Sequence, residues 1–96
     1  FQFQHPNLVE VTNYGILEDI GIYYVMPFYE KIEPISYCKK NGIDAFLNIF
    51  FQLLCGLHFL HQRRKRHGDL TLDNLILTKA ENQLQVRISD FGLSSL

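Results

Sequence analysis

The stretch that decides the fold runs from residue 67 to residue 92 and reads HGDLTLDNLILTKAENQLQVRISDFG. Two short apolar runs in it, Leu75–Leu77 and Val86–Ile88, flank a polar turn at Lys79–Gln83. This pattern predicts an antiparallel hairpin. The tripeptide at residues 90–92 would then follow directly after a strand.

Three polar side chains beside these strands carry the chemistry that the sequence predicts. Asp69 and Asn74 are five residues apart, which one loop can bring together, and the hairpin can return the chain so that Asp90 faces both. Two carboxylates and an amide supply hard oxygen ligands that suit Mg²⁺, and a carboxylate not used as a ligand can orient a hydroxyl group. This inventory predicts phosphoryl transfer. The alternative is that all three side chains only cap turns, as Asp and Asn beside strands commonly do.

A long apolar helix is predicted upstream of this stretch. Residues Ala45–Gln62 are rich in Leu, Phe and Ile, and Asp44 stands where an N-cap residue would. Asp44, Asn48 and Gln52 recur every four positions and form a narrow wet stripe on a helix that is otherwise apolar. Such a helix belongs inside a larger protein. Polar residues interrupt its apolar run, which falls short of the roughly 20 apolar residues of a membrane span, so we expect no membrane segment in this window.

The first part of the chain is β-rich. Leu8–Tyr14 and Ile20–Phe28 carry Val, Ile, Tyr and Phe and predict an antiparallel pair with a turn near Glu18. Pro27 has no N–H and would close the second strand. Residues 29–42 are mixed in composition and predict a connector with one short helix.

Length and composition narrow the class of protein. Ninety-six residues allow one small domain at most, and 47% hydrophobic with 20% charged residues is a globular composition. A formal net charge of -1 provides no overall field for nucleic acid, so no such partner is expected. Cys38 and Cys55 are too few for a disulfide framework and form no metal pattern, which predicts reduced thiols in a cytoplasmic, intracellular protein. The chain begins with Phe1 rather than Met, and we expect it to be a piece of a longer protein.

Together these motifs resemble those of the eukaryotic-like protein kinases, whose catalytic loop reads H-R-D-L-x-x-x-N and is followed by D-F-G. The corresponding strings are HGDLTLDN at residues 67–74 and DFG at residues 90–92. Six matched positions would coincide by chance with a probability on the order of 10⁻⁷ per placement. HPNLV at residues 5–9 resembles the segment that leads into the fourth kinase strand, and YYVM at residues 23–26 resembles the fifth strand running into the hinge.

The resemblance covers essentially the whole chain and implies its fold. We expect an α+β, bilobal protein kinase-like fold of the serine/threonine type, of which residues 1–96 form a partial domain. Residues 1–28 would supply strands of the N-lobe and the start of the hinge. Residues 29–96 would supply the hinge and the first part of the C-lobe, with a long buried helix and the catalytic-loop hairpin.

The resemblance also implies catalytic and metal-binding roles. Asp69 would accept or orient the proton of the substrate hydroxyl, Asn74 would hold one Mg²⁺, and Asp90 would chelate the metal that bridges the nucleotide phosphates. The implied reaction transfers the γ-phosphate of ATP to Ser or Thr of a protein substrate. The isolated segment is expected to be inactive, because it contains no Gly-rich phosphate loop and no lysine of the V-A-I-K type.

Four further residues would bind the adenine of ATP if the resemblance holds. Met26 matches the gatekeeper position at the back of the pocket. The carbonyl of Pro27 and the N–H of Tyr29 match the hinge groups that pair with adenine, and Ile76 matches the apolar residue beneath the ring. All four assignments rest on the resemblance alone.

Two departures from the family pattern leave other functions open. Gly68 replaces the arginine that usually receives an activation-loop phosphate, and Thr71 replaces a lysine that usually lies near the γ-phosphate. The string HGDLT is also similar to the loops of atypical kinases in tRNA modification, and HGD occurs in aminoglycoside and choline kinases. The alternatives are therefore a small-molecule or atypical kinase of related fold, or a non-catalytic binding module of the pseudokinase type.

Overall fold

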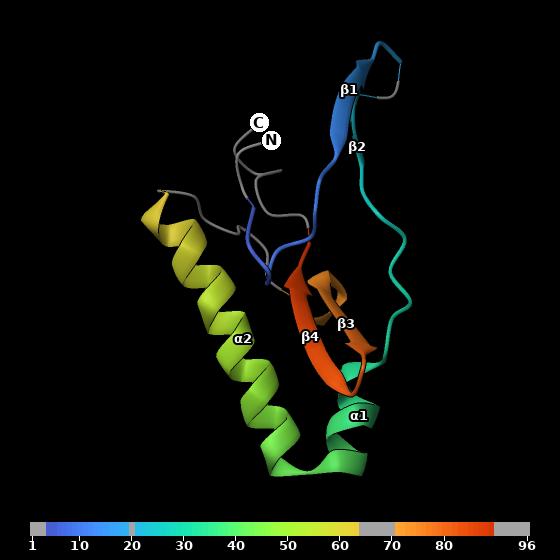
Figure 1. The fold of residues 1–96 in the computed structure, drawn as a ribbon. Helices are drawn as coiled ribbons and strands as arrows, with labels where there is room; N and C mark the ends of the chain where they lie inside the picture. Colours follow the sequence, from blue (N-terminus) through green and yellow to red (C-terminus); the bar gives the residue numbers. More distant parts are fainter. Residues whose placement is uncertain (1–3, 20, 64–70, 90–96) are drawn as a thin grey trace.

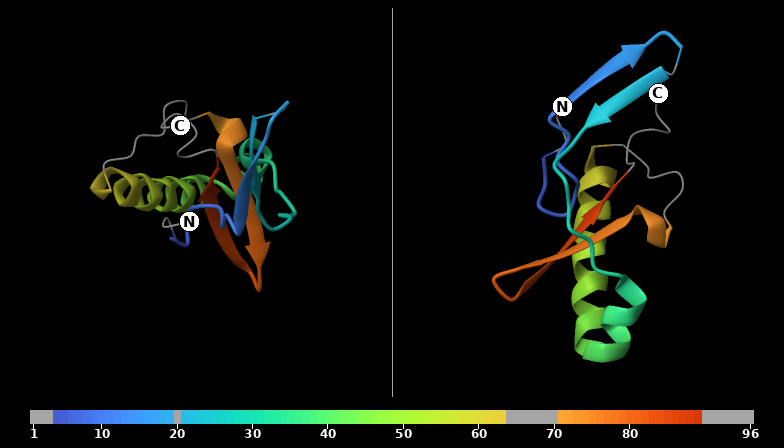
Figure 2. Two further views of the ribbon diagram at one scale, coloured as in Figure 1. Left: turned by 90° about the horizontal axis from the view of Figure 1, so that it is seen from above. Right: turned by 90° about the vertical axis from the view of Figure 1, so that its right-hand side faces the viewer.

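The structure is a computed structural model that describes residues 4–19, 21–63 and 71–89. Within these ranges the chain forms two antiparallel hairpins and two helices (Figure 1). The first hairpin stands at one end of the molecule, away from the second helix. The second hairpin lies against that helix, and the two further views in Figure 2 show the same arrangement. The α+β class predicted from the sequence is confirmed.

The first hairpin consists of β1 (Asn13–Leu17) and β2 (Gly21–Val25). Their register pairs the first residue of β1 with the last residue of β2, and the turn contains Glu18 as predicted. β2 ends two residues before Pro27, so the predicted end at Phe28 was three residues too late. The pairing itself is confirmed.

The predicted start of the first strand at Leu8 was wrong, because residues 8 and 9 belong to the core. Leu8 forms a parallel bridge with Ile88, and the Val9 N–H donates to the Ile88 carbonyl over 3.1 Å. Leu8 and Val9 are only 3% and 1% exposed. Their strand-like composition therefore reflects pairing with the far end of the chain and not with β2.

Two helices follow the first hairpin. α1 (Pro34–Asn41) is the short helix expected in the connector, and the Glu33 side chain caps it by accepting a hydrogen bond from the Ser36 N–H. α2 (Ile43–Gln62) begins after Gly42, whose φ of 83° lets the chain turn between the helices. The predicted N-cap at Asp44 was wrong by two positions, since Asp44 lies in the first helical turn.

The second hairpin joins a 3₁₀ turn, η1 (Leu72–Asn74), to β3 (Leu75–Ala80) and β4 (Gln83–Ile88). The turn is tighter than the predicted Lys79–Gln83, because Glu81 and Asn82 alone turn the chain with φ of 52° and 66°. Positive φ at both central residues is typical of the two-residue turns that match the twist of paired strands.

The core lies between α2 and the second hairpin. Its buried side chains fall into two clusters, one of Leu8, Val9, Leu60, Ile76 and Ile88 and one of Ile49, Leu77 and Val86. Gly56 marks the closest approach of α2 to this hairpin. A Cβ at that position would lie 2.9 Å from Ile88 Cδ1 and 3.0 Å from the Asn7 carbonyl oxygen.

The face of α2 that points away from the hairpin is apolar and exposed. It carries Phe46, Leu47, Phe50, Phe51 and Leu54, each between 47% and 66% exposed. The long buried helix expected from the sequence is thus buried on one side only, because no other described segment covers this face.

α2 also meets the length and composition of a membrane span, with a mean hydropathy of 1.6 over 18 residues and 22% of that window buried. The polar interruptions do not lower its hydropathy enough to exclude a span on composition. The core helix of a soluble protein can have the same length and the same apolar composition.

Candidate functional site

The sequence-predicted site falls partly within the described residues. Asp69 and Asp90 lie outside them, as do the other residues of the DFG string and of the HGD string. Asn74, Met26, Pro27, Tyr29 and Ile76 are described. The geometry of the site is therefore built from these five residues and their neighbours.

Asn74 is the last residue of η1 and comes directly before β3. Its N–H donates to the Thr71 carbonyl over 3.0 Å, which closes the 3₁₀ turn. Its carbonyl oxygen accepts from the Ser89 N–H over 2.8 Å and from Ser89 Oγ over 3.1 Å. Ser89 is 8% exposed and is followed in the sequence by Asp90. The structure thus joins one predicted magnesium ligand to the residue that precedes the other.

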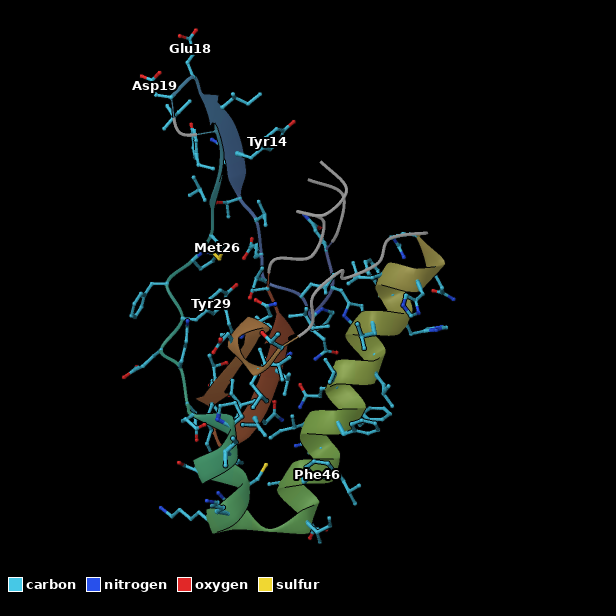
Figure 3. All side chains as sticks on the ribbon, turned by 180° about the vertical axis from the view of Figure 1, so that it is seen from behind. Tyr14, Glu18, Asp19, Met26, Tyr29 and Phe46 are labelled. Carbon is cyan, nitrogen blue, oxygen red and sulfur yellow. The ribbon has the colours of Figure 1, made fainter. Side chains whose placement is uncertain are left out.

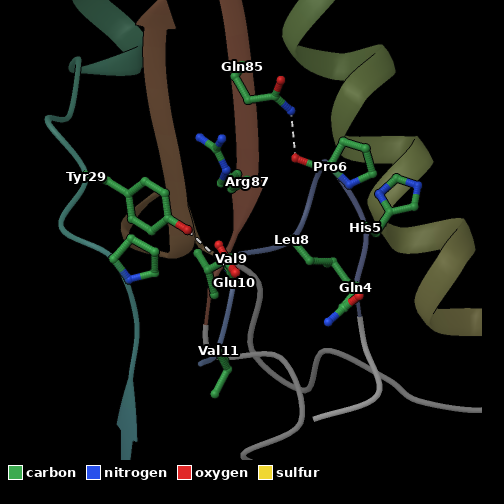
Figure 4. A pocket seen from close by; sticks show the side chains of 11 residues that line it. Gln4, His5, Pro6, Leu8, Val9, Glu10, Val11, Tyr29, Gln85 and Arg87 are labelled. Carbon is green, nitrogen blue, oxygen red and sulfur yellow. Dashed lines mark hydrogen bonds between the residues drawn. The ribbon is translucent and has the colours of Figure 1, made fainter. Parts of the chain in front are cut away.

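The hinge residues lie along the segment between β2 and α1 (Figure 3). Met26 is 38% exposed. Pro27 and Tyr29 line a cavity of about 670 Å³ together with Leu8, Val9 and other residues (Figure 4). Within this cavity the Tyr29 hydroxyl accepts a hydrogen bond from the backbone N–H of the neighbouring Glu10 over 3.1 Å.

Arg87 on β4 lines this cavity and also a second one of about 430 Å³, as does Tyr29. Its guanidinium carbon lies 4.9 Å from the centre of the Tyr29 ring, and its Nη1 donates to Thr78 Oγ1 over 3.0 Å. A guanidinium over an aromatic face is a favourable contact. Tyr29 is therefore held at its hydroxyl group by the Glu10 N–H and at its ring by Arg87.

The structure does not bring the four predicted adenine-binding residues to one described cavity. Met26 and Ile76 line neither of the two. Ile76 is 5% exposed and packs with Leu8, Val9, Leu60 and Ile88 in the core. Their contacts with a nucleotide stay predictions.

The loop at residues 5–9 has a hydrogen-bonding pattern of its own. His5 Nδ1 accepts from the Asn7 N–H over 3.0 Å, and its ring centre lies 4.7 Å from that of Phe59 on α2. Burial, and secondly the positive charge of Arg63, lower the pKa of His5 below its ordinary value. The neutral form of His5 is the one that this loop accommodates.

Sequence reasoning missed two residues that contact β4, Asn7 and Gln52. Both place a side-chain amide against the strand edge that β3 does not use. Gln52 was part of the polar stripe with Asp44 and Asn48, which predicted a wet face of the helix. The polar stripe could have indicated this contact. A single row of polar side chains on an otherwise apolar helix is expected where those side chains bond to buried backbone groups, as well as where they face water.

Within the described residues, no group of three or more His, Cys, Asp or Glu side chains is placed to hold a metal ion. Asn74 is the predicted magnesium ligand that the structure describes. An amide oxygen with two carboxylates is a donor set that suits Mg²⁺. Asn74 meets this requirement chemically, and its carboxylate partners belong to residues outside the described ranges.

Comparison with known proteins identifies the class of the molecule. A family model described as the protein kinase domain matches residues 1–96. The chain therefore belongs to the protein kinase family, and the resemblance seen in the catalytic-loop and DFG strings is confirmed.

Individual relatives are similar along almost the whole chain. It is 34% identical over 97% of its length to CBL-interacting serine/threonine-protein kinase 10 of Arabidopsis thaliana. It is 35% identical over 98% to serine/threonine-protein kinase PLK4 of Aedes aegypti, and 33% identical over 97% to CBL-interacting protein kinase 2 of Oryza sativa subsp. japonica. The chain spans only 19%, 12% and 20% of the length of these three relatives.

Proposed function

We propose that the protein containing these residues transfers the γ-phosphate of ATP to Ser or Thr hydroxyls of protein substrates, with Mg²⁺. The observation that carries the proposal is the pair of hydrogen bonds from Ser89 to the Asn74 carbonyl. These bonds tie the last residue of the catalytic-loop string to the residue that precedes the DFG string. Membership of the protein kinase family and relatives that are named serine/threonine-protein kinases support the same reaction.

In this proposal three residues act on the phosphate. Asp69 orients the substrate hydroxyl and accepts its proton, while Asn74 and Asp90 hold Mg²⁺ against the nucleotide phosphates. When bound there, Mg²⁺ would supply positive charge next to the transferred phosphate group. The protein contributes mainly by positioning the reactants and by fixing the charges around them.

The same proposal assigns the nucleotide and the lobes. Pro27 and Tyr29 present hinge groups to adenine, with Met26 behind the ring and Ile76 beneath it. Residues 1–28 belong to the N-lobe and residues 29–96 to the hinge and C-lobe of a bilobal domain. The free thiols Cys38 and Cys55 are consistent with the cytoplasmic location that we propose.

Substitution of the two carboxylates in the full-length protein tests this function. Asp69→Asn and Asp90→Ala should each abolish phosphate transfer while leaving the thermal melting transition in place. Asp73→Asn is the matched control, because Asp73 is an exposed carboxylate in η1 that belongs to the catalytic-loop string and has no assigned role in the reaction. Unchanged turnover in Asp69→Asn or Asp90→Ala would remove the assignment of that residue.

A related kinase acting on a small molecule is the second candidate, favoured by Gly68 and Thr71. These residues leave out two cations that protein kinases usually place near phosphates. Measuring ATP consumption with protein and with small-alcohol acceptors separates the two. Transfer to the small alcohol alone would overturn the protein substrate, and absence of ATP consumption with either would favour a binding module.

A further inference from the structure

β4 is held along both of its edges, and the two edges are held differently. One edge pairs with β3 in a regular antiparallel register from Gln83 to Ile88. The other edge has no neighbouring strand over residues 84–86 within the described residues. There the backbone groups bond to the side chains of Asn7 and Gln52, which we call the amide clamp.

Gln52 uses every hydrogen-bonding position of its amide. Its Oε1 accepts from the Val86 N–H over 2.9 Å and from Asn7 Nδ2 over 3.0 Å. Its Nε2 donates to the Leu84 carbonyl and to Asn48 Oδ1, both over 2.9 Å. A primary amide offers two acceptor positions and two donors, so this side chain is saturated. Its orientation is fixed by its partners.

Asn7 is the second member of the clamp and bonds to the same edge of β4. Its Nδ2 donates to the Val86 carbonyl over 2.9 Å and also to Gln52, which uses both of its N–H groups. Its backbone carbonyl accepts from the Ile88 N–H over 2.9 Å. Asn7 is 7% exposed, so a lost partner would leave a polar group without water.

The clamp acts on the strand that ends at the candidate site. Three residues after Val86 the chain reaches Ser89, whose N–H and Oγ both donate to the Asn74 carbonyl. Sliding β4 along α2 would break the bonds to Leu84, Val86 and Ile88 together. The position of Ser89 relative to Asn74 therefore depends on Asn7 and Gln52.

We propose that Asn7 and Gln52 are positioning residues for the magnesium and phosphate site, acting through β4. This inference rests on the proposed function for its catalytic consequence. Residues that orient metal ligands without touching the metal typically change metal affinity by about 10–100-fold when they are replaced. Loss of the clamp should therefore raise the Mg²⁺ concentration that gives half-maximal phosphate transfer by about tenfold, the lower end of that range.

The experiment uses the full-length protein with Asn7→Asp and Gln52→Met. Each variant removes the donors that reach β4, and Gln52→Met keeps a similar length. Asn48→Ala is the matched control, because it removes one partner of Gln52 and leaves the bonds to Asn7 and β4 intact. Gln52→Glu is a milder variant that keeps the acceptor for the Val86 N–H and loses the donor to Leu84, and it should give a smaller shift.

Two measurements are made on each variant at a temperature where its melting curve shows it folded. The first is the Mg²⁺ dependence of phosphate transfer at fixed ATP. The second is hydrogen exchange at the amides of Val86, Ile88 and Ser89. We expect a higher half-saturating Mg²⁺ and faster exchange at these amides in Asn7→Asp and Gln52→Met, with neither change in Asn48→Ala.

A purely structural role predicts a different result. Lower stability alone would reduce the rate in proportion to the folded fraction and leave the half-saturating Mg²⁺ unchanged. That outcome, or an equal Mg²⁺ shift in Asn48→Ala, would overturn the positioning role. If wild-type protein transfers no phosphate, the proposed function fails. Exchange at the Ser89 amide then decides whether the clamp holds β4 against Asn74, and unchanged exchange in the clamp variants would refute it.

Discussion

Gly56 offers a sharp test of the packing between α2 and the second hairpin, because two effects of opposite sign meet there. In an exposed helix interior, Gly→Ala stabilises by about 1 kcal/mol. In this structure the added Cβ would lie 2.9 Å from Ile88 Cδ1 and 3.0 Å from the Asn7 carbonyl oxygen. Carbon atoms in favourable contact are about 3.5–4.0 Å apart, so the neighbours would have to move.

The balance of these effects decides the sign of the change. Ile88 is 0% exposed and Asn7 belongs to the amide clamp, so neither can yield into solvent. Overpacking in a filled core costs about 1–3 kcal/mol. Against a gain of about 1 kcal/mol from helix propensity, Gly56→Ala should lower the free energy of unfolding by up to about 2 kcal/mol.

Urea unfolding of the full-length protein measures this change, with His58→Ala as the control. His58 is exposed on the same helix, two residues from Gly56, and its substitution reports helix propensity without new packing contacts. His58→Ala should stabilise by a few tenths of a kcal/mol, on the order of the propensity difference. If Gly56→Ala stabilised the protein by about 1 kcal/mol as well, the close approach of α2 to β4 would be refuted.

Two further predictions concern the core and the pH dependence of stability. Leu60→Ala should cost about 2–5 kcal/mol of unfolding free energy in a denaturant titration, since Leu60 is 1% exposed. Leu54→Ala on the exposed face of the same helix should cost under about 1 kcal/mol, and equal costs would contradict the assigned core. Folding lowers the pKa of His5 below the ordinary histidine value of 6.5. As the pH falls through 6.5, His5 therefore binds a proton in the unfolded chain before it does so in the folded chain. The stability from neutral His5 is thus present above that pH and is lost between 6.5 and the folded pKa. The difference in unfolding free energy between wild type and His5→Gln should show this loss, and a difference that is flat with pH would contradict it.

Local patterns in the sequence predicted the elements that depend on near neighbours. The hairpin before the DFG string, the end of the long helix at Gln62 and the pairing of the first two strands are all found. Each is set by contacts within about 20 residues, such as the turn at Glu81 and Asn82. Alternation and helical periodicity report such contacts directly.

The errors occur where distant segments meet. Leu8 and Val9 read as part of a strand, yet they pair with Ile88 at the other end of the chain. Gln52 was predicted to lie on a solvated face of the helix, yet its side-chain amide forms hydrogen bonds with the backbone of β4. A strand or helix pattern shows that a face is apolar or polar but not which segment covers it, because tertiary contacts decide that.

For the candidate site, too, the sequence predicted residue identities but not the contacts between distant residues. The strings around Asp69 and Asp90 predict which groups react, and these assignments stay predictions because both residues lie outside the described ranges. Spacing alone does not reveal that the Asn74 carbonyl binds Ser89, because the residues are 15 positions apart and meet only through the hairpin register. The amide clamp could not be predicted from the sequence either, because Asn7 and Gln52 are 45 positions apart.

The separation of 79 residues between Asn7 and Val86 has a consequence for biosynthesis. A ribosome adds about 5–20 residues per second, so the early loop emerges about 4–16 seconds before its partner strand is made. During that interval Leu8 and Val9 lack their pairing with Ile88, although Leu60 of α2, from the same core cluster, is made earlier than β4. The native contacts between residues 7–9 and β4 therefore form only late in the synthesis of this segment.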